Sequence, residues 1–260
     1  MPDLRDQVLA DFATLRVPLR AEHLDALLDR GAREGLTHLH FLHLLLSEQA
    51  DRRRERRIAN RIREACFRNP YTLATFDWQF NAPTIARTQI EELASGAFLG
   101  RQDNLVLIGP SGVGKSHLIQ AIGRAACAEG YRVRYTTSAG LIVKLTAALA
   151  DQTLPKKVRY YGSFDLLIVD EFGFDHLERR EARDAASLLF KVIDARSPQR
   201  STALVTNVAF DAWGDYLGDA PLAMALLDRI VDGAIILKME GKSYRAHRAQ
   251  PAGSSRKLEK

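Results

Sequence analysis

The sequence has only two cysteines and no long apolar run. Cys66 and Cys127 stand in unlike segments, so neither a disulfide framework nor a cysteine metal site is predicted. His38, His40 and His43 lie close together, but they lack the further ligands that structural zinc needs. No apolar run approaches the roughly 20 residues that cross a membrane, and no early segment resembles a secretion signal. We therefore expect no membrane partner and a reducing, cytoplasmic environment.

Positive charge is concentrated toward the two ends of the sequence. Lysine and arginine number 37 against 32 aspartate and glutamate, which gives a net charge of +5 and a pI of about 9.3. Residues 71–237 are slightly acidic, so the basic surplus lies before and after them. This pattern favours basic appendages that meet an anionic polymer such as DNA. A solvated tail without a partner is the alternative for residues 238–260.

Residues Gly109–Ser116 read G-x-x-x-x-G-K-S, the phosphate-binding P-loop. An apolar run precedes the motif and a helical pattern follows it, as the motif requires. Lys115 is suited to the β- and γ-phosphates, and the Ser116 hydroxyl is suited to Mg²⁺. We expect ATP to be bound by this loop and its neighbours, with Mg²⁺ as the metal. The loop residues in question are Gly109, Pro110, Ser111, Gly112, Val113, Gly114, Lys115, Ser116 and His117.

Apolar runs alternate with helical patterns through the middle of the sequence. The apolar runs are 104–108, 133–136, 166–169 and 202–206, and the helical patterns are 116–129, 138–150, 181–195 and 220–231. Continuous apolar strands separated by helices predict an α/β fold, a parallel sheet with helices on both faces. About 15 residues separate Arg229 from the C-terminal tail, too few for a helical lid. We therefore expect a lidless P-loop core.

A helical N-terminal part precedes this core. Leucine spacing predicts a helix over 21–32, and a longer helix begins near Thr37 and continues through an arginine-rich stretch. Asn69-Pro70 should end it, because the residue before a proline is disfavoured in a helix. We place the N-terminal helical domain at 1–69, the ATPase domain at 70–245 and a disordered basic tail at 246–260. The ATPase domain opens with an aromatic-rich stretch and a helix to about Phe98.

Two carboxylates, Asp170 and Glu171, follow the apolar run 166–169. Asp170 fits the Mg²⁺ role together with Ser116. Glu171, one residue further, is placed to orient or deprotonate a water that attacks the γ-phosphate. A small-molecule kinase does not need this second carboxylate, because its substrate supplies the nucleophile. The acid pair therefore favours hydrolysis.

Two further residues are candidates for the catalytic machinery. Asn207 follows the run 202–206, and strand ends of a parallel sheet line the ligand crevice, although a Thr-Asn pair can also be a simple turn. Arg229 is the only lysine or arginine within 201–237. An arginine from a neighbouring subunit can neutralise charge in phosphoryl transfer. The alternative for Arg229 is an ion pair with Asp228 or Asp232 of its own chain.

Two groups of cations are candidates for DNA contacts. One is the arginine-rich helix, and the other precedes the Asp170 strand and would face the channel of a ring or spiral. Solvated helix faces are the alternative for both groups. No base-reading motif is present, so binding should depend little on sequence and strongly on salt. The candidates are Arg52, Arg53, Arg56, Arg57, Lys144, Lys156, Lys157 and Arg159.

The combined motifs resemble the IstB-like ATPases, insertion-sequence helper proteins related to the DnaC helicase loaders within the AAA+ initiator class. The resemblance covers roughly 15–245 and rests on Gly109–Ser116, Asp170–Gly173, Thr206-Asn207, Leu227–Ile230, Gly241–Arg245, Thr37–Leu42 and Asn81–Pro83. It implies an AAA+ ATPase, a homo-oligomer in a ring or spiral, that binds double-stranded DNA and assists a cognate transposase. Asn207 would be the sensor and Arg229 the trans-acting arginine. The setting would be the bacterial cytoplasm, at the nucleoid.

Other functions stay open on the sequence alone. A DnaC-type helicase loader shares every core motif, and a transposase partner or a helicase partner would separate the two. A DNA scaffold that binds nucleotide but rarely hydrolyses it differs in its ATPase rate. A small-molecule kinase is disfavoured by Glu171 and by the basic ends.

Overall fold

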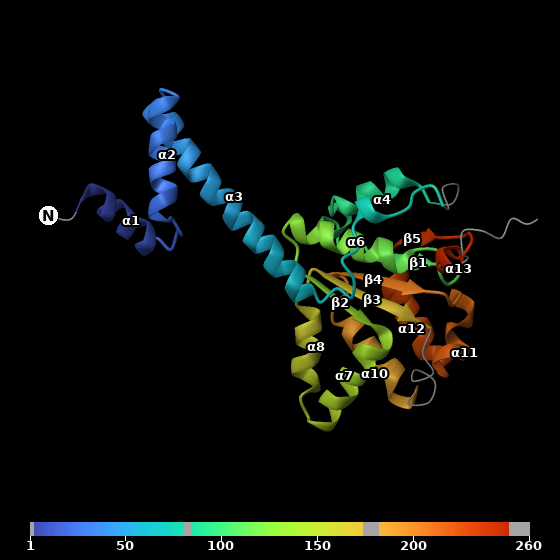
Figure 1. The fold of residues 1–260 in the computed structure, drawn as a ribbon. Helices are drawn as coiled ribbons and strands as arrows, with labels where there is room; N and C mark the ends of the chain where they lie inside the picture. The colour runs from blue at the N-terminus through green and yellow to red at the C-terminus, as the bar shows by residue number, and fades with distance from the viewer. Residues whose placement is uncertain (1–2, 81–84, 174–181, 250–260) are drawn as a thin grey trace, which may run out of the picture. The chain divides into compact units, whose positions relative to one another are not determined.

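The computed structural model describes residues 3–80, 85–173 and 182–249. The chain divides into two compact units, Met1–Asn60 and Arg61–Lys260. Among the described residues, no helix has the length and apolar character needed to span a membrane. Both units are drawn in Figure 1.

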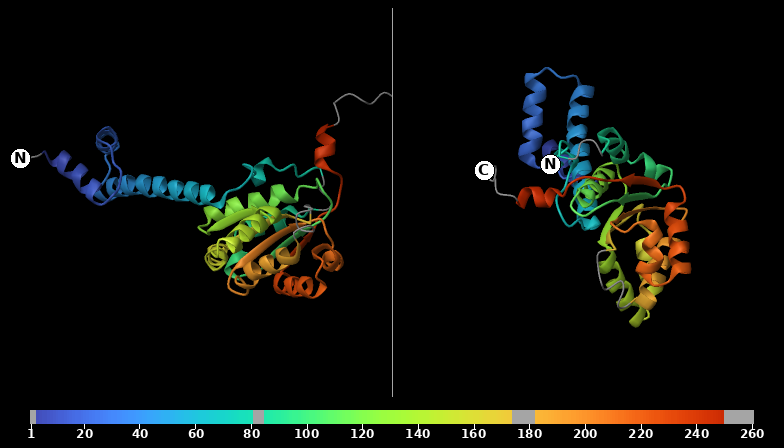
Figure 2. Two further views of the ribbon diagram at one scale, coloured as in Figure 1. Left: turned by 90° about the horizontal axis from the view of Figure 1, so that it is seen from below. Right: turned by 90° about the vertical axis from the view of Figure 1, so that its right-hand side faces the viewer.

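The first unit is helical and contains α1 (Leu4–Thr14), α2 (Ala21–Arg33) and the first part of α3 (His38–Ala65). Leucines of α2 and α3 are buried, and the two helices lie side by side in Figure 2. His23 of α2 and Glu48 of α3 approach to 2.7 Å between Nε2 and Oε2. The Thr37 hydroxyl accepts the backbone N–H of His40 at 3.3 Å, which confirms Thr37 as the N-cap of α3.

Helix α3 ends earlier than the sequence predicts. Its last residue is Ala65, and Cys66 adopts a φ of +57°, in the left-handed region that commonly ends helices. The expectation that Asn69-Pro70 ends the helix is therefore wrong. Residues 66–70 instead form a connection whose contacts prove important for the site.

The second unit is built on a five-stranded parallel sheet in the order β2-β3-β4-β1-β5. The strands are β1 (Leu105–Ile108), β2 (Val133–Thr137), β3 (Leu166–Phe172), β4 (Ser201–Thr206) and β5 (Ile235–Lys238). The four predicted strands are confirmed. The fifth has no prediction from the sequence pattern, because β5 is a sheet edge with partly exposed side chains rather than a buried run.

Helices cover both faces of the sheet, as predicted (Figure 1). On one face α6 (Lys115–Ala128) and α4 (Arg87–Ala94) pack against side chains such as Leu107 and Ile168. On the other, α7 (Ser138–Ala150), α10 (Ala182–Asp194) and α12 (Ala220–Val231) pack against side chains such as Val106 and Leu167. Neighbouring strand residues thus point to opposite faces, and both faces are buried.

The remaining elements are short. They are η1 (Leu73–Thr75), α5 (Ala97–Gly100), α8 (Leu154–Gly162), η3 (Phe210–Ala212), α11 (Trp213–Leu217) and α13 (Tyr244–Ala249). The single helix predicted up to Phe98 is two helices, because Gly96 has a φ of +77° between α4 and α5. After β5, α13 is the one helix within the described residues, which agrees with a lidless core. Residues 246–249 of the expected tail belong to α13, and 250–260 lie outside the described residues.

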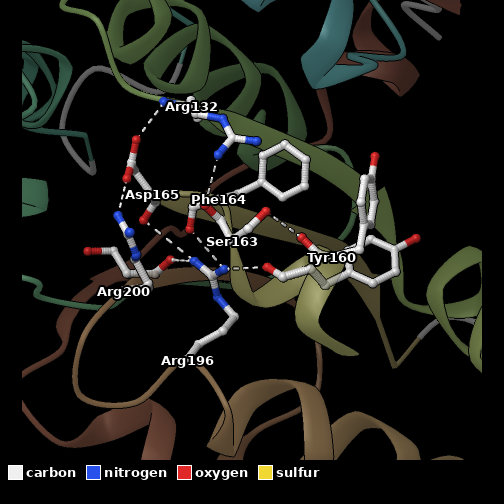
Figure 3. A network of polar contacts seen from close by, with 9 residues as sticks. Arg132, Tyr160, Ser163, Phe164, Asp165, Arg196 and Arg200 are labelled. Atoms are coloured by element: carbon white, nitrogen blue, oxygen red, sulfur yellow. Dashed lines mark hydrogen bonds and ion pairs between the residues drawn. The ribbon is translucent and has the colours of Figure 1, made fainter. Parts of the chain in front are cut away.

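A buried arginine joins the amino ends of β3 and β4 (Figure 3). Arg196 follows α10 and is fully buried. Its Nη1 donates to the carbonyls of Tyr161 at 2.6 Å and Phe164 at 3.0 Å, and its Nε donates to the Thr202 hydroxyl at 3.1 Å. Its Nη2 donates to the Ser201 carbonyl at 2.5 Å. The guanidinium therefore fastens α8, β3 and β4 together at the edge opposite the P-loop.

Candidate functional site

A cavity of about 770 Å³ lies where the P-loop follows β1, at the carboxyl ends of the strands. Its walls come from the P-loop, the aromatic segment 70–80, the end of β3 and the start of α13. The lining residues that matter below are Tyr71, Phe76, Lys115, Ser116, Glu171 and Arg245. This is the edge where parallel sheets bind ligands.

Two P-loop glycines allow the cavity walls to approach closely. Gly112 has a φ of +86°, and a Cβ there would lie 2.2 Å from the Ser243 Oγ. Gly114 has a φ of +104°, and a Cβ there would lie 2.8 Å from the Phe76 ring. The backbone N–H of Tyr244 donates to the Gly112 carbonyl at 2.9 Å. Glycine is therefore required both for the loop conformation and for these contacts.

Lys115, the P-loop lysine, is buried at the start of α6. Its Nζ donates to the carbonyls of Gly109 at 2.6 Å and Pro110 at 2.7 Å. Burial lowers the pKa of Lys115 to about 8, and Arg245 acts in the same direction while Asp170 opposes it. The ammonium lies in a position where an anion would relieve the cost of burying its charge.

The Asp170 carboxylate is fixed by three donors. Its Oδ1 accepts the Ser116 hydroxyl at 3.0 Å and the Glu171 N–H at 2.8 Å. Its Oδ2 accepts the Tyr135 hydroxyl at 2.9 Å. Burial raises the pKa of Tyr135, with Asp170 the next cause, so the phenol remains a donor. A serine hydroxyl beside a buried carboxylate is an oxygen donor set that fits Mg²⁺.

Glu171 lies in an unusual backbone conformation beside this carboxylate. Its φ is +60°, and the pairing of β3 with β4 gains one residue between Val169 and Phe172, a β-bulge. The bulge lets Asp170 be buried while the next side chain, Glu171, lines the cavity. Its Oε1 accepts Arg68 Nη1 at 2.8 Å. Positive φ at a non-glycine residue occurs at turns and helix ends as well as at active sites, and here it accompanies the bulge that directs Glu171 to the cavity.

His117 ties the aromatic segment to the P-loop helix. Its ring stacks on Tyr71 with centroids 4.2 Å apart, and its Nε2 lies 2.9 Å from the Thr72 carbonyl oxygen. The Phe76 ring meets it edge-on at 5.2 Å. His117 thus lines the cavity together with residues 111–116 and also holds the aromatic wall in place, whereas Gly109 and Pro110 are not among the lining residues.

The structure does not bring Asn207 and Arg229 into the cavity. Asn207 follows β4 and lies against Gly173, where its Oδ1 would be 3.1 Å from a Cβ at that glycine. Arg229 of α12 pairs with Asp194 at 3.0 Å and Asp228 at 3.1 Å. The Arg229 carbonyl accepts the side-chain amide of Asn104, which precedes β1, at 3.0 Å. Arg229 is therefore at the sheet edge opposite its own P-loop.

The candidate DNA-binding cations fall in two groups. Arg52, Arg53, Arg56 and Arg57 are exposed on α3 in the first unit. In the second unit Lys144 lies on α7, and Lys156, Lys157 and Arg159 lie on α8, a helix that contacts α7. Lys144, Lys156 and Arg159 are exposed. Lys157 is partly buried, and its Nζ lies 5.8 Å from the Tyr160 ring centroid.

Several site residues have no sequence prediction. Tyr135 could have been found from the alternation in β2, which points it toward the same sheet face as Ile168. Arg68 meets Glu171 across 103 residues, and no local pattern indicates such a contact. The motif residues Asn81–Pro83 lie outside the described residues.

The sheet order, the P-loop after β1 and the acid pair in β3 define a P-loop AAA+ fold. The AMPPCP-bound DnaA from Aquifex aeolicus has the same fold, with a TM-score of 0.52 and 22% identity. That match covers 69% of this chain and 53% of the DnaA chain, so this chain spans about half of that solved structure.

The chain belongs to the IstB-like ATP binding protein family, which it matches over residues 10–252. It is 35% identical over 242 residues to a protein described as the ATP-binding protein of insertion sequence IS21 from Pseudomonas aeruginosa, covering 93% of this chain and 89% of the relative. It is 31% identical over 245 residues to the corresponding protein of insertion sequence IS232 from Bacillus thuringiensis subsp. berliner, covering 94% and 96%.

Proposed function

We propose that this protein is an Mg·ATP-dependent, DNA-binding switch that assists a transposase. The observation that carries the proposal is the convergence of Lys115, the Ser116–Asp170 pair and Glu171 around one cavity. Relatives described as ATP-binding proteins of insertion sequences support ATP as the nucleotide and transposition as the process.

Each residue has a role that follows from its position. Lys115 exchanges its two P-loop carbonyls for phosphate oxygens, which restores a counter-charge to the buried ammonium. Ser116 and Asp170 would hold Mg²⁺, which when bound neutralises phosphate charge. Glu171 orients the attacking water and accepts its proton. Arg245 lines the same cavity and adds positive charge near Lys115.

Arg229 and Asn207 act around this site in an assembly. Because Arg229 lies at the sheet edge opposite its own P-loop, the γ-phosphate that it meets is that of a neighbouring subunit. The Asp194 and Asp228 carboxylates hold it before assembly. Asn207 would act as the sensor of the γ-phosphate by the family resemblance; in the single chain it lies at the end of β4 outside the cavity walls. ATP binding then favours a homo-oligomer on DNA, and hydrolysis releases it.

The DNA contacts are proposed for the two cation groups on α3 and on α7 with α8. Phosphate contacts of this kind are sequence-independent and weaken as salt rises. Replacing Arg52, Arg53, Arg56 and Arg57 by Gln should weaken duplex binding at every sequence and reduce its salt dependence. Fluorescence anisotropy at several salt concentrations measures both effects.

The proposal is tested by Glu171→Gln. The amide cannot accept a proton, so steady-state ATP hydrolysis should fall by about 100-fold or more while ATP binding is retained. The matched control is Glu91→Gln, an exposed carboxylate on α4 that pairs with Arg87. Wild-type turnover in Glu171→Gln would refute the assignment, and very slow turnover in the wild type with duplex DNA present would favour a nucleotide-binding scaffold.

The trans role and the partner are tested separately. Arg229→Ala should lower turnover and ATP-dependent assembly together, and intact assembly and turnover would exclude the role. Co-purification with a transposase supports the proposal, whereas co-purification with a hexameric helicase supports a helicase loader.

A further inference from the structure

An aromatic side chain is exposed where the C-terminal end of α8 meets the sheet. Tyr160 has 43% of its surface exposed, and its ring contacts that of Phe164, with the centroids 5.2 Å apart. Phe164 itself is buried. An exposed ring that packs on a buried one offers a flat surface on which another planar group can stack.

Positive charges surround these two rings. Arg134 and Lys157 lie 5.7 and 5.8 Å from the centroid of the Tyr160 ring. Arg132 lies 5.2 Å from the centroid of the Phe164 ring (Figure 3). Arg132 and Arg134 are two residues apart at the edge strand β2, so their side chains lie on the same face of the sheet. We call these five residues the aromatic–cation surface.

The contacts of the two arginines leave their charge uncompensated. Arg132 Nη1 donates to the Ser163 carbonyl at 3.4 Å, and Arg134 Nη1 donates to the Glu64 carbonyl at 2.9 Å. A backbone carbonyl satisfies a donor but carries no net charge. Guanidinium groups in this state attract phosphate, which they bind in bidentate geometry.

The segment beneath the exposed ring is fixed by the buried arginine of Figure 3. Arg196 donates to the carbonyls of Tyr161 at 2.6 Å and Phe164 at 3.0 Å, so the end of α8 and the residues after it have little freedom. Asp165 is the one carboxylate labelled in Figure 3, and it is already paired with Arg200. The surface is therefore rigid before any ligand binds, which lowers the entropic cost of binding.

We propose that the aromatic–cation surface binds single-stranded DNA, with an unpaired base stacked on Tyr160 and the flanking phosphates held by the two arginines and Lys157. The cations near the Tyr160 ring lie close to the limit of about 6 Å for a cation–π contact, so a base can displace them from the ring. This inference rests on the proposed DNA-binding function, and it names the form of DNA that this part of α8 takes.

The aromatic ring is what favours an unpaired strand. Duplex DNA presents phosphates outward and keeps its bases stacked inside, so cations alone suffice to bind it. A single strand offers the faces of its bases as well, and proteins bind it by combining a cationic groove with aromatic side chains. An acidic peptide would pair with the cations but would leave Tyr160 without a stacking partner.

The experiment measures binding of a labelled oligothymidylate of about 20 nucleotides, and of a random-sequence duplex of the same length, by fluorescence anisotropy. Tyr160→Leu keeps an apolar side chain without a π-face and should weaken oligothymidylate binding by about 5- to 100-fold, the loss expected for one base stack. Tyr160→Phe retains the ring and should bind within about twofold of the wild type. Both variants should bind the duplex as the wild type does.

A salt titration tests the phosphate contacts. Arg132→Gln should reduce the slope of log affinity against log salt by about 0.7, the value for one phosphate contact on a single strand. Arg101→Gln, which breaks an exposed pair with Asp103, is the matched control and should change neither affinity nor slope.

The outcomes separate this inference from the function on which it rests. If the wild type does not bind the duplex, the proposed DNA-binding function itself is contradicted. If it binds the duplex but not oligothymidylate, or if Tyr160→Leu binds oligothymidylate as the wild type does, the surface is refuted and the proposed function stands. Equal losses for both probes in Tyr160→Leu also refute it. A preference for oligouridylate of about tenfold or more would assign the surface to RNA instead.

Discussion

Two buried cations lie at opposite edges of the same sheet, and they are neutralised in different ways. Arg196 at the amino ends of β3 and β4 is surrounded by oxygens of Tyr161, Phe164, Ser201 and Thr202 (Figure 3). Lys115 at the carboxyl edge has two carbonyls of its own loop and a cavity beside it. Burial lowers the pKa of both, to about 9 for Arg196 and about 8 for Lys115.

The difference separates a structural charge from a binding charge. The Arg196 partners belong to strands and helices that meet there, and they already occupy its donors, so no ligand is needed. The Lys115 partners are carbonyls that phosphate oxygens can replace. Burial and a lowered pKa alone therefore do not identify a functional cation; the replaceability of its partners does.

The largest effect is expected at the structural cation. Arg196→Met leaves several buried carbonyls without donors, and the free energy of unfolding should fall by about 3–5 kcal/mol. Urea unfolding measures this, with Arg200→Met as control, since Arg200 forms an exposed pair with Asp165 and should cost less than about 1 kcal/mol. If the two variants lost the same free energy of unfolding, Arg196 would not be the structural cation that we infer.

At Lys115, the binding cation, we expect the opposite result: a large loss of ATP hydrolysis without a loss of stability. Lys115→Met should reduce ATP hydrolysis by about 100-fold or more, because the phosphate loses its main counter-charge in a dry site. Its free energy of unfolding should stay the same or rise, since an ammonium no longer has to be buried. A loss of stability as large as that of Arg196→Met would show that Lys115 is a structural cation too.

The third prediction concerns the proton that Lys115 takes up when ATP binds. The Lys115 pKa is about 8 without ligand, and phosphate should raise it, so ATP binding near pH 8 should take up part of a proton. ATP affinity should accordingly fall as pH rises above 8, by up to about tenfold per pH unit. Calorimetry in buffers of different ionisation enthalpy detects the uptake. Lys115→Met should remove it, and uptake that persists in this variant would assign the proton elsewhere.

The smallest effect is expected at Tyr135, whose hydroxyl donates to Asp170 at 2.9 Å. Tyr135→Phe frees the carboxylate to rotate, so the Mg²⁺ concentration for half-maximal hydrolysis should rise by roughly two- to tenfold. Mn²⁺ binding followed by electron paramagnetic resonance gives a second readout. Tyr160→Phe, an exposed phenol, is the control, and identical metal affinity in both variants would mean that Asp170 is held well enough by Ser116 and the Glu171 N–H.

The P-loop edge was predictable from the sequence and the opposite edge was not, for a physical reason. Gly109–Ser116 and Asp170-Glu171 are contiguous residue types tied to one chemistry, and buried parallel strands are contiguous apolar runs. In the sequence Arg196 cannot be told from a surface arginine. It is buried only because the segment after α10 meets α8, β3 and β4, whose oxygens accept its hydrogen bonds. Arg68 is missed for the same reason. Helix α3 ends early because the backbone of Cys66 has a positive φ. No glycine or asparagine stands at that position to signal such a conformation in the sequence.

The contact of Ser243 and Tyr244 with Gly112 determines when, during synthesis of the protein, the nucleotide cavity can be completed. A ribosome makes the P-loop first and delivers the wall that closes on it only after α12 and β5 have been translated. A nascent chain that stalls after β4 has the P-loop but lacks the cavity wall formed by Tyr244 and Arg245. It also lacks β5, one of the two strands beside β1. Nucleotide binding should therefore appear late in translation, after most of the sheet has formed.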